Sequence, residues 1–300
     1  VVSEKDGVLT KEELIAALKD KNFNAVLSLL TDHIDADIFD AAGRECKIFA
    51  NYAVGFDNFD LAAARARNII ITNTPDVLTD TVAEHTFALM LAIAHRVCEA
   101  DRFTRKGLYQ GWAPLLLLGD DISRKTIGIV GLGRIGSRVA HHAVRGFDAK
   151  VIYYDVKQNA DFEKEYSAVF MPRVEDLLPQ ADFVSIHVPL LPETQHLMND
   201  ARFQLMKKTA YLVNTSRGPI VDESALLRAL RAGTIRGAAL DVFEHEPRVD
   251  PLLAELENII LTPHIASATF QTREQMARVA ANNIIEALAG NIPPSIVQAR

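Results

Sequence analysis

The sequence predicts an α/β protein built from two doubly wound domains, and three observations support this fold class. From about residue 125 onward, short β-branched runs alternate regularly with segments of helical spacing. These runs are apolar throughout, as expected of parallel strands that helices cover on both faces. A shorter region with the same alternation precedes them, and a chain of 300 residues, 49% of them hydrophobic, is long enough for two cores.

The larger domain contains seven candidate strands. They are residues 126–131, 150–155, 168–171, 183–188, 210–215, 237–242 and 258–263. The segments between them have helical spacing, and one of them starts near Asp222 and ends at Gly233, where a left-handed cap fits. This alternation predicts a parallel sheet with helices on both faces.

The smaller domain has the pattern of a flavodoxin-like unit. Helices are predicted at residues 10–20 and 58–68, and strands at 25–30, 46–53 and 68–74. In such a unit the first strand is usually central, and no candidate for it precedes these elements. We therefore expect this domain to be truncated at its N-terminus.

Two helices predict the domain boundaries. One long apolar helix is predicted over about residues 80–105, and a C-terminal helix over about 272–289 is expected to return to the first domain. We place the smaller domain at residues 1–97, the larger domain at 98–268 and the returning helix at 269–300. The larger domain is then inserted within the smaller one.

Charge and cysteine content exclude several classes of partner. The 32 basic and 39 acidic residues give a net charge of −7, whereas nucleic acids and anionic membranes attract basic surfaces, so we expect neither partner. Cys46 and Cys98 form no Cys-x-x-Cys pair and are interpreted as reduced thiols. The apolar run at 87–94 is too short to span a bilayer. These features predict a cytoplasmic protein.

The segment "IVGLGRIGSRVA" contains three glycines, Gly131, Gly133 and Gly136, in a Gly-x-Gly-x-x-Gly pattern. Alone, this pattern is weak, because glycine is common in turns. Here it follows a predicted strand, opens a predicted helix, and precedes a second strand that ends in the acidic Asp155. This is the context in which the pattern binds a dinucleotide, with the pyrophosphate at the helix N-terminus. The larger domain is therefore predicted to be a Rossmann-like nucleotide-binding domain.

Asp155 predicts which dinucleotide is bound. A carboxylate at this position accepts hydrogen bonds from the ribose hydroxyls, and it would repel a 2′-phosphate at ~4 Å by up to ~4 kcal/mol at an effective dielectric of 20. NAD(H) is thus preferred over NADP(H), although Lys157 partly offsets the repulsion. The alternative is that Asp155 is an ordinary turn residue at a strand end.

Three polar residues follow the carboxyl ends of predicted strands, the edge at which ligands bind in open α/β sheets. They are Arg217 in "NTSRG", Glu246 in "DVFEHEP" and His264 in "LTPHIAS". Taken singly, each is more often a surface or capping residue than a catalytic one.

These segments, in this order and together with the glycine loop and "NYAVGFDNFD", resemble the D-isomer-specific 2-hydroxyacid dehydrogenase family. The resemblance covers essentially the whole chain. Within the family, "NTPDVLTDTVAEH" and "GWAPLLLLG" are most similar to the glyoxylate/hydroxypyruvate reductases. The resemblance to the family implies two Rossmann-like domains, with an NAD-binding domain inserted into a flavodoxin-like substrate domain.

The resemblance implies an NAD(H)-dependent reduction of a small 2-oxo acid, glyoxylate or hydroxypyruvate, to the D-2-hydroxy acid. Arg217 would bind the substrate, His264 would donate the proton, and Glu246 would orient the imidazolium. The choice of Glu246 over Glu244 rests only on the family's Glu-Pro ending. Two alternatives stay open: oxidation of another small anion such as phosphite, and an NAD-sensing binding protein or corepressor.

The family's binding residues carry over to specific positions of this sequence. The implied cofactor contacts are Gly131, Gly133, Arg134, Ile135, Gly136, Asp155, Val188, Pro189, Thr194, Thr215, Ser216 and Asp241. Asp241 has the alternative of being a buried structural acid. The substrate carboxylate is expected at the backbone N–H groups around Val54 and Gly55, where a glycine allows close approach. No cluster has metal-ligand spacing, so no metal is expected.

Residues 107–123 form an apolar segment between the long helix and the first strand of the larger domain. An exposed segment of this composition indicates a partner. In the family the corresponding arm embraces a second subunit, so a homodimer is implied. Trp112 either lines the neighbour's pocket or anchors the interface.

Overall fold

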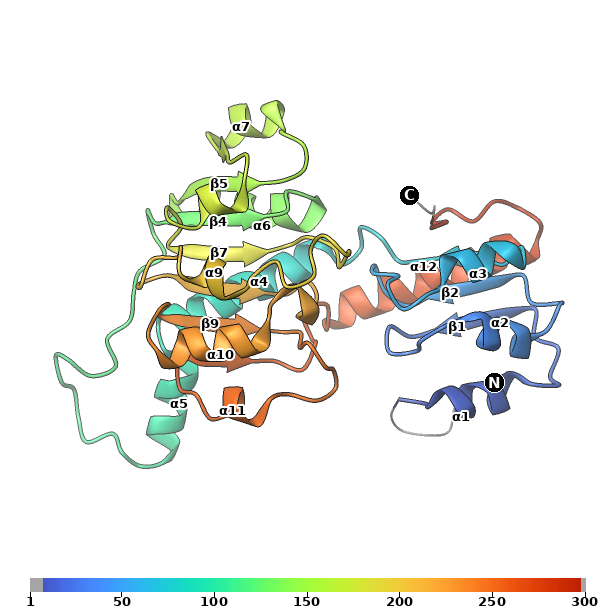
Figure 1. Ribbon diagram of the computed structural model, residues 1–300, viewed down its shortest axis with the longest axis horizontal. Coiled ribbons are helices and arrows are strands. Elements are labelled where there is room, and N and C mark those ends of the chain that lie inside the picture. Colours follow the sequence, from blue (N-terminus) through green and yellow to red (C-terminus); the bar gives the residue numbers. More distant parts are fainter. Residues whose placement is uncertain (1–7, 298–300) are drawn as a thin grey trace. The chain divides into compact units, whose positions relative to one another are not determined.

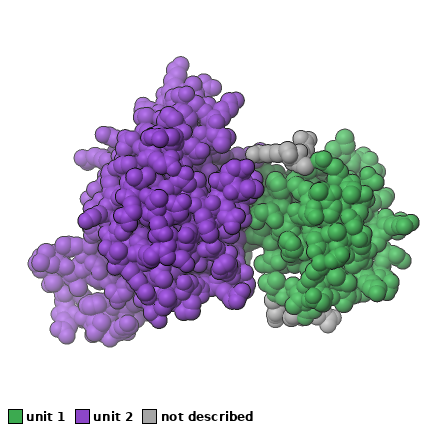
Figure 2. All heavy atoms as spheres, viewed as in Figure 1, with its two compact units in different colours: residues 1–78, 268–300 green, residues 79–267 purple. Residues whose placement is uncertain are grey.

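The computed structural model describes residues 8–297 (Figure 1). The chain forms two compact units, shown in different colours in Figure 2: unit 1 comprises Val1–Leu78 and Ala268–Arg300, and unit 2 comprises Thr79–Ser267. Unit 2 is thus inserted within unit 1. Among residues 8–297, no helix combines the length and the apolar character that crossing a membrane requires.

Unit 2 contains a seven-stranded sheet in which all strands are parallel. Its strands are β4 (Thr126–Val130), β5 (Lys150–Tyr154), β6 (Val169–Phe170), β7 (Phe183–Ile186), β8 (Tyr211–Asn214), β9 (Gly237–Leu240) and β10 (Ile259–Leu261). Their order is β10-β9-β8-β7-β4-β5-β6, so the order reverses beside β4. The predicted doubly wound α/β fold is confirmed, and ligands of such sheets bind at this reversal.

Helices cover both faces of this sheet and bury a separate apolar cluster on each (Figure 1). They are α4 (Thr79–Ala94), α5 (Val97–Arg105), α6 (Arg134–Phe147), α7 (Ala160–Tyr166), α8 (Val174–Leu177), α9 (Asp200–Phe203), the 3-10 turn η1 (Gly218–Ile220), α10 (Glu223–Arg231) and α11 (Pro251–Ala254). One cluster contains Met90 and Val139 from α4 and α6, and the other contains Leu177 and Leu226 from α8 and α10. The strands are therefore apolar on both sides.

The prediction of a single long helix over about residues 80–105 is wrong, because the structure has two helices there, α4 and α5. Arg96 has left-handed backbone angles, with φ of 55°, and separates α4 from α5. Its side chain forms a bidentate ion pair with Glu99, with N–O distances of 2.8 and 2.7 Å. The apolar side chains of α4 are buried, whereas α5 has no fully buried residue, so packing fixes only the first of the two helices.

The boundary between the units falls at Leu78 rather than at the expected residue 97. The physical reason is that α4 packs against α6 and against the strands of the seven-stranded sheet. Hydrophobic residues such as Phe87 and Met90 thereby join the core of unit 2.

Unit 1 is a smaller α/β layer with three parallel strands in the order β1-β2-β3. Its elements are α1 (Lys11–Leu18), β1 (Ala25–Ser28), α2 (Ala36–Ala42), β2 (Ile48–Asn51), α3 (Leu61–Ala66), β3 (Ile70–Thr72) and α12 (Phe270–Leu288). Phe49 of β2 packs edge-on against Phe39, with ring centroids 5.0 Å apart. The C-terminal helix α12 contacts β2 and β1 and buries Met276 and Ala280 there.

Candidate active site

The glycine loop joins β4 to α6 at the point where the strand order reverses. Gly131 has a φ of 97°, and a Cβ on it would lie 2.8 Å from the carbonyl oxygen of His187. A Cβ on Gly136 would lie 2.0 Å from the oxygen of Gly131. Gly133, in contrast, faces open space and caps α6 without any side-chain hydrogen bond. The loop therefore packs tightly on its inner side and leaves room beside the helix N-terminus, as a bound pyrophosphate requires.

Asp155 directly follows β5 and lies against this loop. Its carboxylate accepts hydrogen bonds from the backbone N–H groups of Leu132, at 2.7 Å, and Lys157, at 3.4 Å. The carboxylate is thus held beside the glycine loop rather than at an isolated turn.

Five more cofactor residues implied by the resemblance lie beyond the ends of β7, which neighbours β4, and of β8, which neighbours β7. Thr194 Oγ1 donates a hydrogen bond to the oxygen of Pro189 at 2.7 Å, and the Ser216 hydroxyl donates to the oxygen of Val188. Thr215 Oγ1 lies 3.0 Å from Thr86 Oγ1. Arg134 and Ile135 form the first turn of α6. The structure therefore brings these residues to the same edge of the sheet as the glycine loop.

Arg217 follows β8 and leads into η1. Its carbonyl oxygen accepts a hydrogen bond from Asn214 Nδ2 at 2.9 Å, and its own Nη1 donates to the oxygen of Ser216 at 2.8 Å. The next residue, Gly218, lies so close to Phe243 that an added Cβ would be 1.9 Å from the Phe243 carbonyl. This close approach attaches the Arg217 loop to the loop after β9, and the sequence analysis missed it.

His264 and Glu246 form a pair, with His264 Nδ1 lying 2.9 Å from Glu246 Oε2. The second oxygen of Glu246 accepts the N–H of Phe243 at 3.0 Å. Burial raises the pKa of Glu246, but the hydrogen bond and charge of His264, the Phe243 N–H and the charge of Arg217 outweigh it and leave the pKa lowered. The structure thus brings the three predicted catalytic residues together around an ionised carboxylate.

Glu244 has a different partner from Glu246. Its Oε1 lies 2.7 Å from His196 Nε2, and its backbone N–H donates to Glu223 Oε1 at 2.7 Å. In the sequence, only the Glu-Pro ending favoured Glu246 over Glu244 as the partner of His264. In the structure Glu246 contacts His264 and Glu244 does not.

The chain matches a family model described as the NAD binding domain of D-isomer specific 2-hydroxyacid dehydrogenases over residues 87–266. The chain belongs to the D-isomer specific 2-hydroxyacid dehydrogenase family. It is an NAD-dependent dehydrogenase, and its cofactor is NAD(H). This agrees with the tight inner packing and open outer side of the glycine loop.

Curated relatives and solved structures are similar over nearly the whole chain. Glyoxylate reductase from Korarchaeum cryptofilum is 50% identical over 96% of this chain and 86% of that protein. Glyoxylate reductase from Thermofilum pendens is 48% identical over 99% of this chain and 87% of that protein. A crystal structure of a protein from Thermus thermophilus has a TM-score of 0.91 at 42% identity, covering 98% of this chain and 91% of that one. D-lactate dehydrogenase from Aquifex aeolicus, complexed with NAD and lactic acid, has a TM-score of 0.84 at 31% identity, covering 95% and 89%.

Asp241 of the dehydrogenase is fully buried, and its carboxylate holds the loop that carries His264. It accepts hydrogen bonds from the N–H groups of Ile265 and Ala266, at 2.9 and 2.8 Å, and from the Thr262 hydroxyl at 2.6 Å. The N–H of His264 donates to the Asp241 backbone oxygen at 2.9 Å. These contacts favour the structural alternative for Asp241, while its contact with the cofactor stays a prediction.

His187 directly follows β7 and contacts a serine of that strand. His187 Nε2 lies 2.8 Å from Ser185 Oγ, and burial lowers the pKa of the imidazole to about 3, so the ring is neutral.

Within residues 8–297, no group of three or more His, Cys, Asp or Glu side chains is arranged to hold a metal ion.

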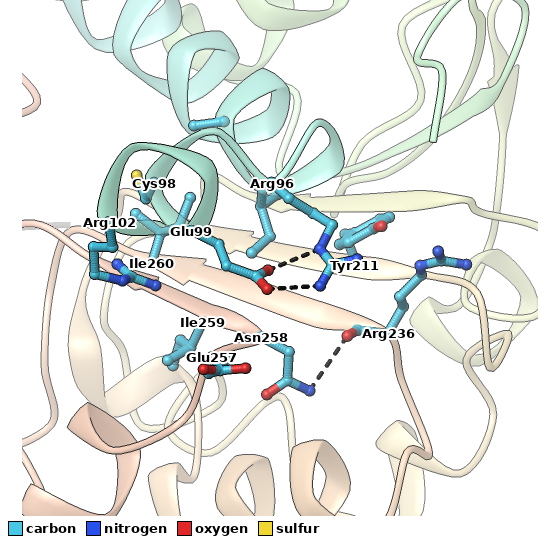
Figure 3. Close-up of a pocket in the computed structure, with 12 residues that line it drawn as sticks. Arg96, Cys98, Glu99, Arg102, Tyr211, Arg236, Glu257, Asn258, Ile259 and Ile260 are labelled. Carbon is cyan, nitrogen blue, oxygen red and sulfur yellow. Dashed lines mark hydrogen bonds and ion pairs between the residues drawn. The ribbon is translucent and has the colours of Figure 1, made fainter. Parts of the chain in front are cut away.

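A cavity of about 370 Å³ lies at the opposite edge of the same sheet from Arg217, Glu246 and His264 (Figure 3). It is lined by Tyr211 and Ile259, the first residues of β8 and β10, and by Arg236, which precedes β9. Figure 3 shows Arg96 paired with Glu99 at this cavity, so its guanidinium already has a partner. Arg217, Glu246 and His264 do not line the cavity.

Replacing Asp241 with Asn should destabilise unit 2 and change its response to acid. Burial raises the pKa of Asp241. Hydrogen bonds from His85, Thr262 and two backbone N–H groups lower it by more than burial raises it, so the pKa in the folded state is below the ordinary value. Its stabilisation is present above the ordinary Asp pKa of about 3.9 and is lost as pH falls through the lower folded value. We expect D241N to lose about 3 kcal/mol at neutral pH, since bonds to charged groups contribute ~1.5–3 kcal/mol each.

Denaturant unfolding of wild type and D241N, repeated from neutral to acidic pH, measures this effect. The difference between the two proteins should shrink at low pH. A difference that stays constant across this range would contradict the role of the ionised carboxylate.

Proposed function

We propose that the dehydrogenase reduces glyoxylate, and also hydroxypyruvate, to the corresponding 2-hydroxy acid, of D configuration where the product is chiral. The observation that carries the proposal is the 2.9 Å contact of His264 with Glu246 beside the charge of Arg217. The glyoxylate reductases that are about half identical to this chain support the choice of a small substrate.

Each of the three residues has one role in this reaction. Arg217 binds the substrate carboxylate and the carbonyl oxygen through its planar set of N–H donors. His264 donates a proton to the carbonyl oxygen from Nε2, because Nδ1 faces Glu246. Glu246 holds the ring in that orientation. When bound, NADH supplies the hydride that reaches the carbonyl carbon.

The cofactor site has two parts. The pyrophosphate is held by the glycine loop and the N-terminus of α6. Asp155, beside this loop, accepts hydrogen bonds from the ribose hydroxyls. Val188, Pro189, Thr194, Thr215 and Ser216 line the nicotinamide side at the ends of β7 and β8. Asp155 disfavours a 2′-phosphate by its charge, so NADH is preferred over NADPH.

Turnover with a panel of 2-oxo acids tests this function. Purified protein should consume NADH fastest with glyoxylate or hydroxypyruvate, more slowly with pyruvate and branched 2-oxo acids, and more slowly again with NADPH. We expect His264→Ala to lose about 100-fold or more in kcat while keeping NADH affinity, because a general acid contributes ~10²–10⁴-fold. Arg217→Ala should raise KM and lower kcat together.

Three results would overturn the assignment. Near-normal turnover by His264→Ala would exclude it as the proton donor. NADH binding by wild type without turnover of any 2-oxo acid would favour an NAD-sensing binding protein, and turnover of phosphite with NAD⁺ would favour oxidation of another anion.

Two alanine substitutions in the glycine loop should affect different properties, one the affinity for NADH and the other the melting temperature. A methyl group on Gly133 meets open space, so Gly133→Ala should keep the melting temperature and weaken NADH binding. A methyl group on Gly136 meets the Gly131 oxygen at 2.0 Å, so Gly136→Ala should lower the melting temperature. Thermal unfolding without cofactor and NADH titration measure the two effects. Equal NADH affinity in Gly133→Ala and wild type would contradict a pyrophosphate at this position.

The dehydrogenase also forms a homodimer through residues 107–123. Between α5 and β4 this segment extends away from the sheet of unit 2 with little regular structure (Figure 1). It exposes Leu108, Tyr109, Trp112, Leu115 and Leu118, and the exposed fractions of Trp112 and Leu115 are 84% and 79%. A contiguous apolar segment this exposed favours burial against a second copy. Trp112 either reaches the neighbour's pocket or anchors the interface.

Replacing Leu115 with Asp should convert the dimer to a monomer, because a charge would be buried at the interface. Light scattering during size-exclusion chromatography measures the mass. Ile292→Asp is the matched control, since Ile292 is similarly exposed but lies in unit 1 outside this segment. A monomeric wild type, or a Leu115→Asp variant that stays dimeric, would contradict this interface.

A further inference from the structure

The loop after β2 carries Val54 and Gly55, the proposed site of the substrate carboxylate. Three successive carbonyl oxygens in this loop each accept a hydrogen bond. The N–H of Thr74 donates to the oxygen of Ala53 at 2.8 Å. Asn73 Nδ2 donates to the oxygen of Val54, and Asn51 Nδ2 donates to the oxygen of Gly55, both at 2.8 Å.

These contacts determine where the N–H groups of the loop point. In a planar trans peptide the C=O and N–H bonds point in opposite directions. Holding the oxygens of Ala53 and Val54 therefore fixes the N–H groups of Val54 and Gly55, and holding the oxygen of Gly55 fixes that of Phe56. Within the part of the chain that the structure describes, none of these three N–H groups has a hydrogen-bond partner.

Asn51 is itself held in one orientation. It is fully buried, and its Nδ2 also donates to Asn58 Oδ1 at 3.1 Å. Asn58 in turn donates to the backbone oxygens of Leu29 and Asp32. A reversed Asn51 amide would place its oxygen against two acceptor oxygens, so the donor must face Gly55.

Asn73 is held by the C-terminal part of unit 1. Its N–H donates to the oxygen of Ser295 at 3.2 Å, and its own oxygen accepts from Asn283 Nδ2 at 3.3 Å. Asn283 belongs to α12, is 1% exposed, and also accepts the N–H of Ser295. A continuous set of hydrogen bonds thus runs from α12 through Asn73 to Val54.

We propose that Asn73 and Asn51 are positioning residues for the substrate. They hold the loop carbonyls inward, so that the N–H groups of Val54 and Gly55 are directed at the carboxylate of a 2-oxo acid. Asn283 and Asn58 keep the two amides in place. This inference rests on the proposed function, because it assigns the groups that orient the same substrate.

The decisive variant is Asn73→Asp, which keeps the shape of the side chain but replaces the N–H donor with an oxygen. The carboxylate repels the Val54 oxygen, so the peptide turns and its N–H group is no longer fixed. Losing a hydrogen bond to a charged group predicts an increase of about tenfold to a hundredfold in KM for glyoxylate and in the inhibition constant of oxamate. NADH affinity should stay unchanged, since the glycine loop lies in unit 2.

Asn24→Ala is the matched control, because Asn24 Nδ2 also donates to a backbone oxygen, that of Glu45, next to the amino ends of β1 and β2. It should keep the wild-type KM. Asn73→Ala should give a smaller increase than Asn73→Asp, because it removes the donor without adding repulsion. The same kinetics and NADH titration, with melting temperatures, are measured for all proteins.

Three outcomes are distinguishable. An increase in KM and oxamate inhibition constant that is larger than any change in kcat or NADH affinity supports the positioning role. An unchanged KM in Asn73→Asp, or equal losses of melting temperature, kcat and NADH affinity, overturns it. A wild type that turns over no 2-oxo acid overturns the proposed function instead, and binding of oxamate to the NADH complex then still tests the loop.

Discussion

The loop that carries His264 depends on one buried carboxylate. Asp241 directly follows β9, and its two oxygens accept hydrogen bonds from the N–H groups of Ile265 and Ala266, which follow His264. Without these bonds, the loop would leave buried N–H groups unpaired, which costs more than the bonds themselves contribute. His264 keeps a left-handed backbone, with φ of 53°, because these contacts fix the residues around it. The position of the imidazole thus follows from a side chain that need not touch the substrate.

Parallel strand order explains why residues far apart in sequence meet at this place. The strands β8, β9 and β10 are adjacent, so the loops after them carry Arg217, Glu246 and His264 to the same edge. The close approach of Gly218 to Phe243 joins two of these loops, and the contact of His264 with Glu246 joins the other pair. Because each loop is attached to its neighbour, the charge of Arg217 and the Glu246–His264 pair act on one another, and the lowered pKa of Glu246 is the result.

Sequence reasoning predicted the parallel sheet correctly, because its strands are apolar runs that alternate with helices. It also placed the glycine loop, Arg217, Glu246 and His264 after strands, where the structure has them, while the catalytic roles stay predictions. It failed at Arg96, because helical periodicity does not reveal a single left-handed residue between two helices. The asparagine contacts of unit 1 were missed for a related reason: a hydrogen bond from an amide to a distant carbonyl leaves no periodic pattern. Nor does sequence distinguish Glu244 from Glu246, because both are acidic and only geometry shows that Glu246 contacts His264 whereas Glu244 contacts His196.

The proposed function uses two kinds of donor with different physical properties. Arg217 carries a full positive charge, which attracts a carboxylate from any direction and helps to keep Glu246 ionised. The N–H groups of Val54 and Gly55 are neutral and act only at short range and along defined directions. Such donors add no charge that could bind other anions, so their value depends on how accurately they are oriented. In our proposal this orientation is supplied by four asparagines, Asn51, Asn58, Asn73 and Asn283. The C-terminal helix α12 contributes Asn283, whose Nδ2 donates a hydrogen bond to the backbone oxygen of Asn73.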